Sequence, residues 1–238
     1  MNSAILITAR LKSERLPMKV IKPLCGVPMI IHMLDRLKLA KTPAKIIICT
    51  STLEQDSPLE QIANEQGVEC YRGDPDDVIL RLTTAAKLYN VETVINCTAD
   101  NPFVDPIYID KLYQHHIKQN NEFSKIEGLP WGVFCYAMSL KAMEKVCEIK
   151  AEKDTEVWHG YFMETDQFKW DALHVTDKAV SWHNLRLTVD YPEDFEFFKS
   201  VYAHFGDQTY KTSIKDIITY LDDNPSVIEI NSFLKQSY

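Results

Sequence analysis

Residues 4–19 read AILITARLKSERLPMK, an apolar run that leads directly into a strongly cationic segment. The cations are Arg10, Lys12, Arg15 and Lys19, and all four follow the apolar run closely enough to share one loop. In an open α/β sheet, ligands bind beyond the carboxyl ends of the strands, and the loop after the first strand is the usual phosphate site. Four cations in one loop repel one another unless a polyanion lies between them. We therefore expect this loop to bind the triphosphate of a nucleotide.

Apolar runs typical of buried strands alternate with amphipathic stretches through the first half of the chain. Strands are expected at residues 4–8, 45–50, 69–72 and 93–98. Helices, in which apolar residues recur at helical spacing, are expected at residues 29–39, 58–66, 77–89 and 107–119. This alternation predicts the α/β class, with a Rossmann-like, mostly parallel sheet that has helices on both faces.

The pattern is looser beyond about residue 120. Strands are expected at residues 133–137 and 185–189, and an exposed loop at residues 150–155. Helical segments are expected at residues 139–149, 154–165, 192–204, 210–221 and 226–236. We interpret residues 1–238 as a single nucleotidyltransferase domain in which roughly residues 125–185 form a small inserted lobe for the acceptor and for dimerisation.

Composition limits the classes of partner and the compartment. A chain of 238 residues is long enough for one large α/β domain with a full core. The formal net charge of −8 argues against a nucleic-acid partner or an anionic membrane surface, because both require a basic face. Six scattered cysteines without a C-x-x-C pair argue against a zinc site and favour a reducing cytosol. The sequence carries no signal-peptide or long apolar pattern, and we expect a cytoplasmic protein.

Further segments extend the pattern of the cationic loop. They are Gly26-Val27-Pro28-Met29, Thr50-Ser51-Thr52, Asp56-Ser57-Pro58-Leu59, Tyr71-Arg72-Gly73-Asp74 with Asp77-Val78, residues 98–106 (TADNPFVDP) and residues 187–194 (LTVDYPED). In this order they resemble the cytidylyltransferases that activate acidic sugars. The spore-coat polysaccharide biosynthesis branch is the closer one, and the 3-deoxy-manno-octulosonate cytidylyltransferases are a related branch. The resemblance spans roughly residues 4–200 and implies a sheet of the nucleotide-diphospho-sugar transferase type. The family usually has glycine where Met18 stands.

The resemblance implies nucleotide contacts for five residues of the loop, which are Ala9, Arg10, Lys12, Arg15 and Lys19. Among these, Arg10, Arg15 and Lys19 would be catalytic. Attack on an α-phosphorus builds negative charge on the equatorial oxygens and on the departing pyrophosphate, and fixed cations stabilise that charge. The alternative is a solvated basic loop whose cations pair with Glu14 or with other surface acids.

Two aspartates are candidate metal ligands. Asp100 follows the apolar strand at residues 93–98, and Asp190 follows residues 185–189 in the same way. Carboxylates from two strand ends can converge on one hard cation such as Mg²⁺, and the resemblance assigns metal binding to both positions. The alternative for each is an ordinary turn aspartate. We expect Asp105 and Asp194 to be structural, as a helix cap and a first-turn acid.

Contacts to the base and ribose are assigned by the resemblance to Arg72, Gly73 and Asp74. Gly73 could allow the backbone to approach a ring closely, although the same residues also read as a simple turn. Thr50 and Ser51, at another strand end, could add hydroxyl contacts to the nucleotide.

The acceptor is assigned by the resemblance to the segment that contains Trp158 and His159. The alternative is that Trp158 packs at a dimer contact and that His159 is an exposed polar residue. His115 and His116 lie on a helix with many polar residues, and we expect them to be surface residues rather than metal ligands.

A homodimer is expected, because the resembling family is commonly dimeric and because residues 131–170 are rich in aromatic side chains. These are Trp131, Phe134, Tyr136, Trp158, Tyr161, Phe162, Phe168 and Trp170. Aromatic residues are enriched at interface cores. The alternative is that the rings fill only the core of the lobe itself.

The leading functional hypothesis is a Mg²⁺-dependent nucleotidyltransferase that uses CTP. It would place CMP on a sugar or sugar-acid acceptor for surface polysaccharide synthesis and release pyrophosphate. One rival is a glycosyltransferase with a nucleotide-sugar donor, but Ala99-Asp100-Asn101 lacks the second acid of the Asp-x-Asp pattern that such enzymes usually show. The other rival is an inactive module that senses CTP.

Overall fold

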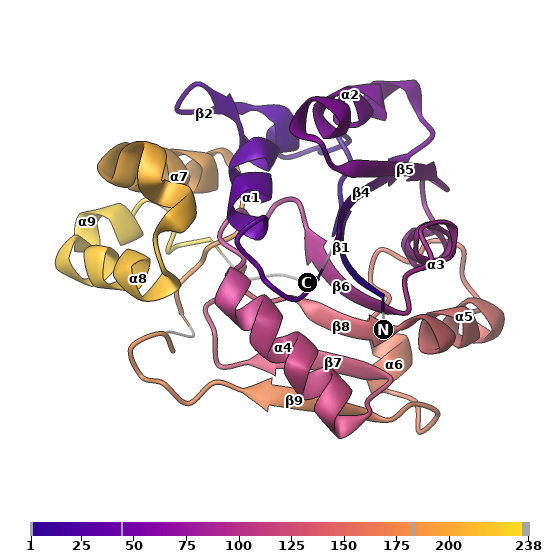
Figure 1. The fold of residues 1–238 in the computed structure, drawn as a ribbon. Coiled ribbons are helices and arrows are strands. Elements are labelled where there is room, and N and C mark those ends of the chain that lie inside the picture. The colour runs from indigo at the N-terminus through magenta and orange to yellow at the C-terminus, as the bar shows by residue number, and fades with distance from the viewer. Residues whose placement is uncertain (1, 44, 182–183, 235–238) are drawn as a thin grey trace.

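The computed structural model describes residues 2–43, 45–181 and 184–234, and they form one sheet of seven strands flanked by helices (Figure 1). The strands of this sheet are β1 Ser3–Thr8, β4 Lys45–Ser51, β5 Glu69–Gly73, β6 Thr93–Thr98, β7 Phe123–Glu127, β8 Tyr136–Ser139 and β9 Trp170–His174. Their order across the sheet is β5-β4-β1-β6-β8-β7-β9. The helices are α1 Met29–Leu37, α2 Ser57–Gln66, α3 Val78–Leu88, α4 Pro106–Gln119, α5 Leu140–Ile149, α6 Gly160–Met163, α7 Pro192–Phe205, α8 Ile214–Asp223 and α9 Pro225–Ile228.

Short elements complete this frame. They are the 3-10 turns η1 Lys19–Ile21, η2 Glu54–Asp56 and η3 Gly206–Lys211, and the two-stranded ribbon of β2 Pro23–Leu24 and β3 Val27–Pro28. The first four strands in space, β5, β4, β1 and β6, are parallel, whereas β8 is antiparallel to both β6 and β7. The prediction of a mostly parallel α/β sheet is therefore confirmed.

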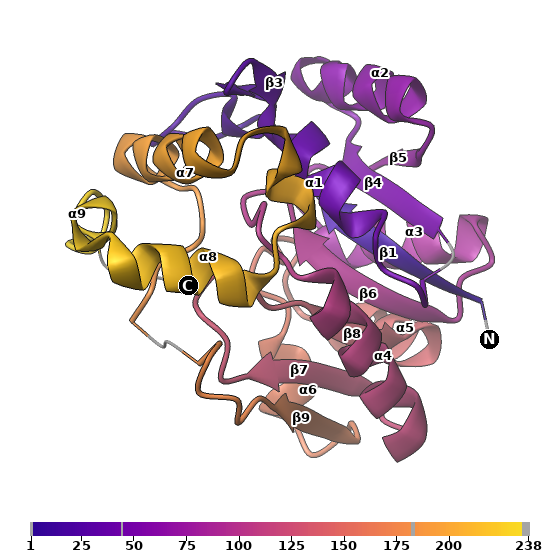
Figure 2. The same ribbon diagram turned by 60° about the vertical axis from the view of Figure 1, so that its left-hand side comes forward.

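Alternation along β1 explains why helices cover both faces of the sheet. Ile5 and Ile7 pack into the core cluster shared with α1, α2, α4, α7 and α8. Ala4 and Leu6 point to the other face, into the cluster shared with α3 and α5. Successive side chains of a strand point to opposite faces, so a strand buried on both sides reads as a continuous apolar run. Figure 2 shows the last helices, α7, α8 and α9, gathered beside α1.

Aspartate side chains cap the starts of α4 and α3, and of these two caps only the one at Asp105 was expected. Asp105 accepts a hydrogen bond from the backbone N–H of Ile107 at the start of α4, at 2.9 Å, which confirms its structural role. Asp77 does the same for α3 through the N–H of Leu80, at 3.1 Å. Asp105 also forms an ion pair, at 3.0 Å, with Arg36, a fully buried arginine of α1.

One expectation for residues 150–165 is wrong. Only α6 is helical there, so the helix predicted over residues 154–165 is much shorter. Residues 150–155 form a loop as expected, and residues 151–154 are exposed. Thr155 is buried, because its hydroxyl donates to Asp77 at 3.0 Å and accepts from the N–H of Ile79 at 3.0 Å. Lys150 also pairs with Asp77. These contacts hold the segment across the start of α3 in an extended path.

The strand predicted at residues 185–189 is also wrong. This segment forms only an isolated bridge between Trp131 and Arg186, and its remaining bonds go to loops. Leu187 N donates to Trp131 O at 2.7 Å, and Val189 N donates to Asp100 O at 2.8 Å. The segment is extended and apolar like a strand, but no neighbouring strand offers it a continuous ladder.

Other boundaries differ from the sequence prediction. The strand expected at residues 133–137 lies at β8, and β7 and β9 were not predicted, because both mix charged with apolar residues near the edge of the sheet. The helix expected over 210–221 divides into η3 and α8, and that over 226–236 is the short α9, with residues 235–236 outside the described chain. The lobe at residues 125–185 stays a prediction, since its strands continue the main sheet.

His116 is buried, which corrects the expectation of a surface histidine. Its side chain is 2% exposed, and its Nδ1 lies 3.0 Å from the Ser124 hydroxyl, which also accepts from Asn121. Burial lowers the pKa of His116 to about 4, and neighbouring His115 acts in the same direction. His115 itself lies 3.3 Å from the carboxylate of Asp171.

We predict that His116 makes the protein less stable in mild acid. The unfolded chain takes up a proton near pH 6.5, whereas folded His116 resists protonation down to about pH 4. Stability is therefore complete above the unfolded pKa and falls by at most about 3 kcal/mol as the pH drops through this window. Urea unfolding of wild type and His116→Gln between pH 7 and 4 should show a weaker pH dependence in the variant. His204→Gln, at an exposed histidine of α7, controls for the loss of one histidine from the unfolded chain. Equal slopes for wild type and His116→Gln would contradict the prediction.

Candidate active site

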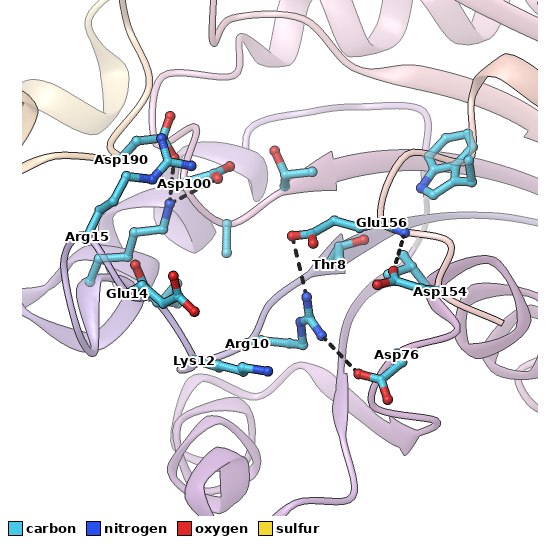
Figure 3. Close-up of a pocket in the computed structure, with 17 residues that line it drawn as sticks. Thr8, Arg10, Lys12, Glu14, Arg15, Asp76, Asp100, Asp154, Glu156 and Asp190 are labelled. Carbon is cyan, nitrogen blue, oxygen red and sulfur yellow. Dashed lines mark hydrogen bonds and ion pairs between the residues drawn. The ribbon is translucent and has the colours of Figure 1, made fainter. Parts of the chain in front are cut away.

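A cavity of about 480 Å³ opens at the carboxyl ends of β1 and β6 (Figure 3). The last residues of these strands, Thr8 and Thr98, lie opposite each other in the parallel register, and both line the cavity. The other lining residues are Arg10, Lys12, Ser13, Glu14, Arg15, Lys19, Val20, Asp76, Val78, Ala99, Asp100, Asp154, Glu156, Trp158 and Asp190. All four predicted cations and both predicted metal ligands therefore meet in one place.

The cationic loop is anchored by its apolar side chains and backbone groups, and its charged side chains line the cavity. Leu11 and Leu16 are buried in the core. The N–H of Leu11 donates to the buried carboxylate of Asp56 at 2.7 Å, and the N–H of Leu16 donates to the Ser13 hydroxyl at 3.3 Å. Anchored backbone groups of this kind fix where the neighbouring side chains begin.

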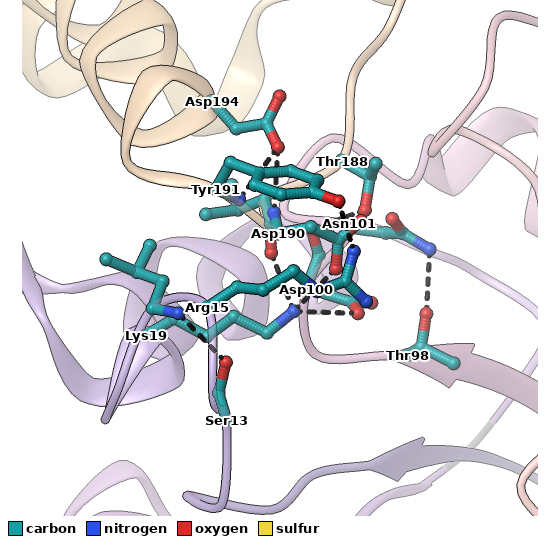
Figure 4. A network of polar contacts seen from close by, with 12 residues as sticks. Ser13, Arg15, Lys19, Thr98, Asp100, Asn101, Thr188, Asp190, Tyr191 and Asp194 are labelled. Carbon is teal, nitrogen blue, oxygen red and sulfur yellow. Dashed lines mark hydrogen bonds and ion pairs between the residues drawn. The ribbon is translucent and has the colours of Figure 1, made fainter. Parts of the chain in front are cut away.

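Lys19 joins the two candidate metal ligands. Its ammonium donates to Asp100 at 3.2 Å and to Asp190 at 2.9 Å, and to the carbonyl of Val189 at 2.7 Å (Figure 4). Burial would lower the pKa of Lys19, but the two carboxylates hold that pKa above its ordinary value. Burial would likewise raise the pKa of Asp190, but Lys19 and Arg186 hold that pKa below its ordinary value.

Arg186 binds the oxygen of Asp190 that Lys19 does not contact. This residue was not predicted from the sequence. It is 2% exposed, pairs with Asp190 at 2.9 Å, and donates from two nitrogens to Asp194 at 2.8 and 3.0 Å. Burial would lower the pKa of Arg186, but Asp194 and Asp190 hold that pKa above its ordinary value. The signal in the sequence was a single arginine inside an otherwise apolar run, residues 185–189.

Asp194 has the structural role that we expected, and it does more than start α7. It is fully buried, and it accepts the backbone N–H groups of Asp190 and Tyr191 at 2.9 and 3.0 Å. The amide of Asn231, near the far end of the described chain, donates to Asp194 at 3.0 Å and to the carbonyl of Arg186 at 3.3 Å.

Arg15 and Arg10 both line the cavity and have different partners. Arg15 is exposed, donates to the Tyr191 hydroxyl at 2.9 Å, and stacks over that ring at 4.8 Å. This hydrogen bond raises the pKa of Arg15. Arg10 donates to the carbonyl of Pro75 at 2.7 Å and lies 3.4 Å from Glu156. Within the described chain, neither arginine pairs with Glu14, but Arg10 lies near two exposed acids, Glu156 and Asp76, so the solvated-loop alternative stays open for Arg10.

Three of the predicted nucleotide contacts are buried away from the cavity. Ala9, Thr50 and Ser51 are 0–2% exposed, and none of them lines it. The Ser51 hydroxyl bonds to Asp56, the residue that anchors the cationic loop. These positions shape the loop, and direct contact with a nucleotide there stays a prediction.

Arg72 and Gly73 end strand β5, and Asp74 begins the turn that follows. The space beside Gly73 is filled, because an added Cβ would lie 2.6 Å from the ring of Tyr71. Asp74 accepts the N–H groups of Asp77 and Asp76, both at 2.9 Å, and these bonds lower the pKa of Asp74. Arg72 turns away to pair with Glu60 at 3.1 Å. None of Arg72, Gly73 and Asp74 lines the cavity, whereas Asp76, which we did not predict, does.

Trp158 lines the cavity, and His159 lies beside it outside the lining. Trp158 is 5% exposed and meets the rings of Phe123 and Phe162 edge-on. His159 is half-buried and stacks on Tyr136, with ring centroids 5.9 Å apart, and burial lowers the pKa of His159. Neighbouring Asp154 and Glu156 line the same wall and were missed, because exposed acids in a loop carry no distinctive pattern.

Met18 has a left-handed backbone, with φ of 59°. Glycine adopts this conformation without a steric penalty, whereas other residues lose about 1–2 kcal/mol. The conformation would be a physical reason for a preference for glycine at this position. The Met18 side chain is 42% exposed, so the longer residue fits without displacing the core.

The donor set suits a magnesium ion better than a transition metal. No group of three or more His, Cys, Asp or Glu side chains gathers in residues 2–43, 45–181 and 184–234. Asp100 and Asp190 offer two carboxylates at the rim of an open cavity. Mg²⁺ commonly takes one or two carboxylates and completes its shell with water and phosphate oxygens.

No helix in the described ranges is long and apolar enough to cross a membrane.

We predict that Asp194 is required for stability, because its loss removes the carboxylate that binds two nitrogens of the buried Arg186. Asp194→Asn should lower the free energy of unfolding by about 3–5 kcal/mol. Glu193→Gln, at the neighbouring half-buried position of the same helical turn, is the matched control and should change it by less than about 1 kcal/mol. Denaturant unfolding measures both. Similar losses for the two variants would exclude a special role for the Arg186–Asp194 pair.

Comparison with known proteins identifies the family. A family model described as cytidylyltransferase matches residues 4–199. The spore coat polysaccharide biosynthesis protein SpsF of Bacillus subtilis is 28% identical over 227 residues, which are 92% of this chain and 94% of that protein. The 8-amino-3,8-dideoxy-manno-octulosonate cytidylyltransferase of Shewanella sediminis is 28% identical over 218 residues, 90% of this chain and 76% of that one.

A solved structure agrees with this match. A cytidylyltransferase from Leptospira borgpetersenii superposes with a TM-score of 0.88 at 28% identity and covers 100% of this chain and 99% of its own. Both branches of the resemblance drawn from the sequence are thus found among the relatives. The chain belongs to the cytidylyltransferase family and is a nucleotidyltransferase enzyme.

Proposed function

We propose that this enzyme transfers CMP from CTP to a hydroxyl group of a sugar or sugar-acid acceptor and releases pyrophosphate, for surface polysaccharide synthesis. One observation carries the proposal. The cations of the loop and the Asp100–Lys19–Asp190 cluster line a single cavity at the carboxyl edge of the sheet. The spore coat protein to which the chain is similar supports the polysaccharide context.

The cationic residues of the cavity would bind the triphosphate, and the two aspartates would bind the metal. In the reaction, a bond forms between the acceptor oxygen and the α-phosphorus, the bond to the β-phosphate breaks, and the hydroxyl proton is lost to solvent. Arg10, Lys12, Arg15 and Lys19 would hold the triphosphate and stabilise the charge that builds on the pyrophosphate as it leaves. Because such chemistry needs mainly positioning and electrostatics, the site requires no covalent nucleophile.

Asp100 and Asp190 would hold a divalent cation, proposed as Mg²⁺, which when bound neutralises phosphate oxygens. Arg186 already pairs with one oxygen of Asp190, so it fixes the direction in which the other oxygen points. Figure 3 places Asp100, Asp190 and Arg15 on one side of the cavity and Asp76, Asp154 and Glu156 on the other. We place the acceptor toward the second side, near Trp158, because the cations of the first side suit the triphosphate.

The glycosyltransferase alternative finds less support. The position after Asp100 is Asn101, whose amide donates to the Thr98 hydroxyl at 2.7 Å and is 7% exposed. It therefore offers no second carboxylate to a donor sugar. An inactive CTP sensor would not need both Asp100 and Asp190 beside the cationic loop.

Pyrophosphate release tests the proposal directly. The purified protein is incubated with Mg²⁺, CTP and a panel of neutral, amino and acidic sugars, and in parallel with nucleotide sugars as donors. Pyrophosphate that depends on both CTP and one acceptor is the expected result. Glycosyl transfer from a nucleotide sugar, or CTP binding without turnover under all conditions, would replace the proposal with one of its rivals.

Asp100→Asn and Asp190→Asn should each lower kcat by roughly 100-fold or more, because the site loses an anionic ligand while the side-chain shape is kept. Asp35→Asn, at a half-exposed aspartate of α1, should keep the wild-type rate. Steady-state kinetics with circular dichroism as a check of folding make the measurement. A near-normal rate in either site variant would return that aspartate to the role of a turn residue.

We further propose a homodimer. Trp158, Phe162 and Phe168 are buried in this chain's own core, which accounts for much of the aromatic load. Trp170 is different, since it is 38% exposed on β9, the last strand of the sheet. An exposed aromatic on an edge strand suits an interface.

Light scattering at micromolar concentration should therefore give twice the chain mass of 27.5 kDa. Trp170→Glu should shift the mass toward the monomer, because it places a charge in the interface. Lys169→Glu, next to it in the chain, is the control for charge alone. A monomeric wild type would leave the rings with a packing role only.

A further inference from the structure

The ammonium of Lys19 lies where the proposed metal site would need a cation. It donates to one oxygen of Asp100 and one oxygen of Asp190, and its third bond goes to the carbonyl of Val189. An ammonium has three donors, and all three are used. The Lys19 side chain is only 13% exposed. The two carboxylates are thus already neutralised by a group of the protein itself.

We propose that Lys19 closes the divalent-cation site of the nucleotide-free enzyme, and that an arriving triphosphate opens it by drawing the ammonium away. This inference rests on the proposed function, because it concerns the same two carboxylates. It makes metal binding dependent on nucleotide. The metal would bind weakly to the enzyme alone and tightly to the enzyme with triphosphate.

Distances explain why ammonium and metal exclude each other. The ammonium nitrogen lies 3.2 and 2.9 Å from the two carboxylate oxygens. Mg²⁺ binds oxygen at about 2.0–2.1 Å, so an ion held by the same two oxygens would lie within about 5 Å of the nitrogen. Cations that close in a partly buried site repel by several kcal/mol. One of them has to leave.

The Lys19 side chain can move away from the two carboxylates, whereas the Arg186 side chain is fixed in place. The Lys19 ammonium ends a flexible stem whose backbone is fixed by the bond from its N–H to the carbonyl of Leu16, at 3.2 Å, so the head can move without the loop. Arg186 is 2% exposed and is tied through two nitrogens to Asp194. It therefore remains on the second oxygen of Asp190 while the first oxygen is released.

The triphosphate supplies what the ammonium gives up. The cavity next to Lys19 is lined by Arg10, Lys12 and Arg15, so a polyanion bound there offers the ammonium new oxygen partners. The vacated carboxylates would repel each other without a cation between them, and the metal fills that place. Because coupling between two ligands is reciprocal, the metal should tighten triphosphate binding by the same factor.

The test measures Mn²⁺ binding to the nucleotide-free protein by the electron paramagnetic resonance signal of free Mn²⁺. Lys19→Met keeps the apolar stem and removes the charge, so this variant should bind Mn²⁺ at least about fivefold more tightly than wild type. Lys12→Met is the matched control, because Lys12 lines the same cavity and contacts neither carboxylate. It should change the affinity by less than about twofold.

A double variant locates the site. Lys19→Met with Asp190→Asn should lose the gained Mn²⁺ affinity, and Lys19→Gln should behave like Lys19→Met. Equal Mn²⁺ affinity for wild type and both Lys19 variants, with the fold confirmed by circular dichroism, would overturn the proposal. So would a gain in affinity that survives Asp190→Asn.

The Mn²⁺ binding test can fail or succeed independently of the pyrophosphate release test of the proposed function. Pyrophosphate release by the wild type together with unchanged Mn²⁺ affinity in Lys19→Met would reject the closing role of Lys19 alone. A gain in Mn²⁺ affinity in a protein that never releases pyrophosphate would keep the closing role of Lys19 and reject the reaction.

Discussion

Parallel pairing of β1 with β6, in the register that sets Thr8 opposite Thr98, is the constraint on which the site depends. It ends two buried strands at one level and so brings the cationic loop and Asp100 out of the sheet side by side. The backbone bond from Val189 to the carbonyl of Asp100 extends this edge by one more segment. This single backbone bond, rather than a strand, places Asp190 beside Asp100.

Three of the loop cations already have protein partners before any substrate arrives. Arg10 pairs with Glu156, Lys19 with two aspartates, and Arg15 with Tyr191, and every partner comes from a distant segment of the chain. Such pairs hold the loop cations in place at modest cost, and each can be exchanged for phosphate oxygens. The site is organised in advance for a polyanion, which is the condition for electrostatic stabilisation of a transition state.

Local patterns predicted the parts of the protein that depend on local forces. The first strand, the cationic loop and the cap at Asp105 are each decided by neighbours in sequence, and all are found where expected. Arg186 escaped prediction because a single arginine in a mostly apolar segment does not show which carboxylates will bind it, and Asp190 and Asp194 had each been given another role. The last two strands of the sheet, β7 and β9, escaped because charged residues are mixed with apolar ones in both, which removes the continuous apolar signal.

Because Asn231 hydrogen-bonds to Arg186 and Asp194, the site becomes complete only late in the synthesis of the chain. This residue lies beyond residues 4–199, the part that the family match covers, yet it contacts both Arg186 and Asp194. A chain leaving the ribosome completes its sheet long before residue 231 emerges, since domains form from the amino end during translation. The support behind Asp190 can close only when the tail has been made. In a nascent chain the sheet and the cationic loop would therefore be folded while Arg186 and Asp194, which support Asp190, still lacked their hydrogen bonds from Asn231.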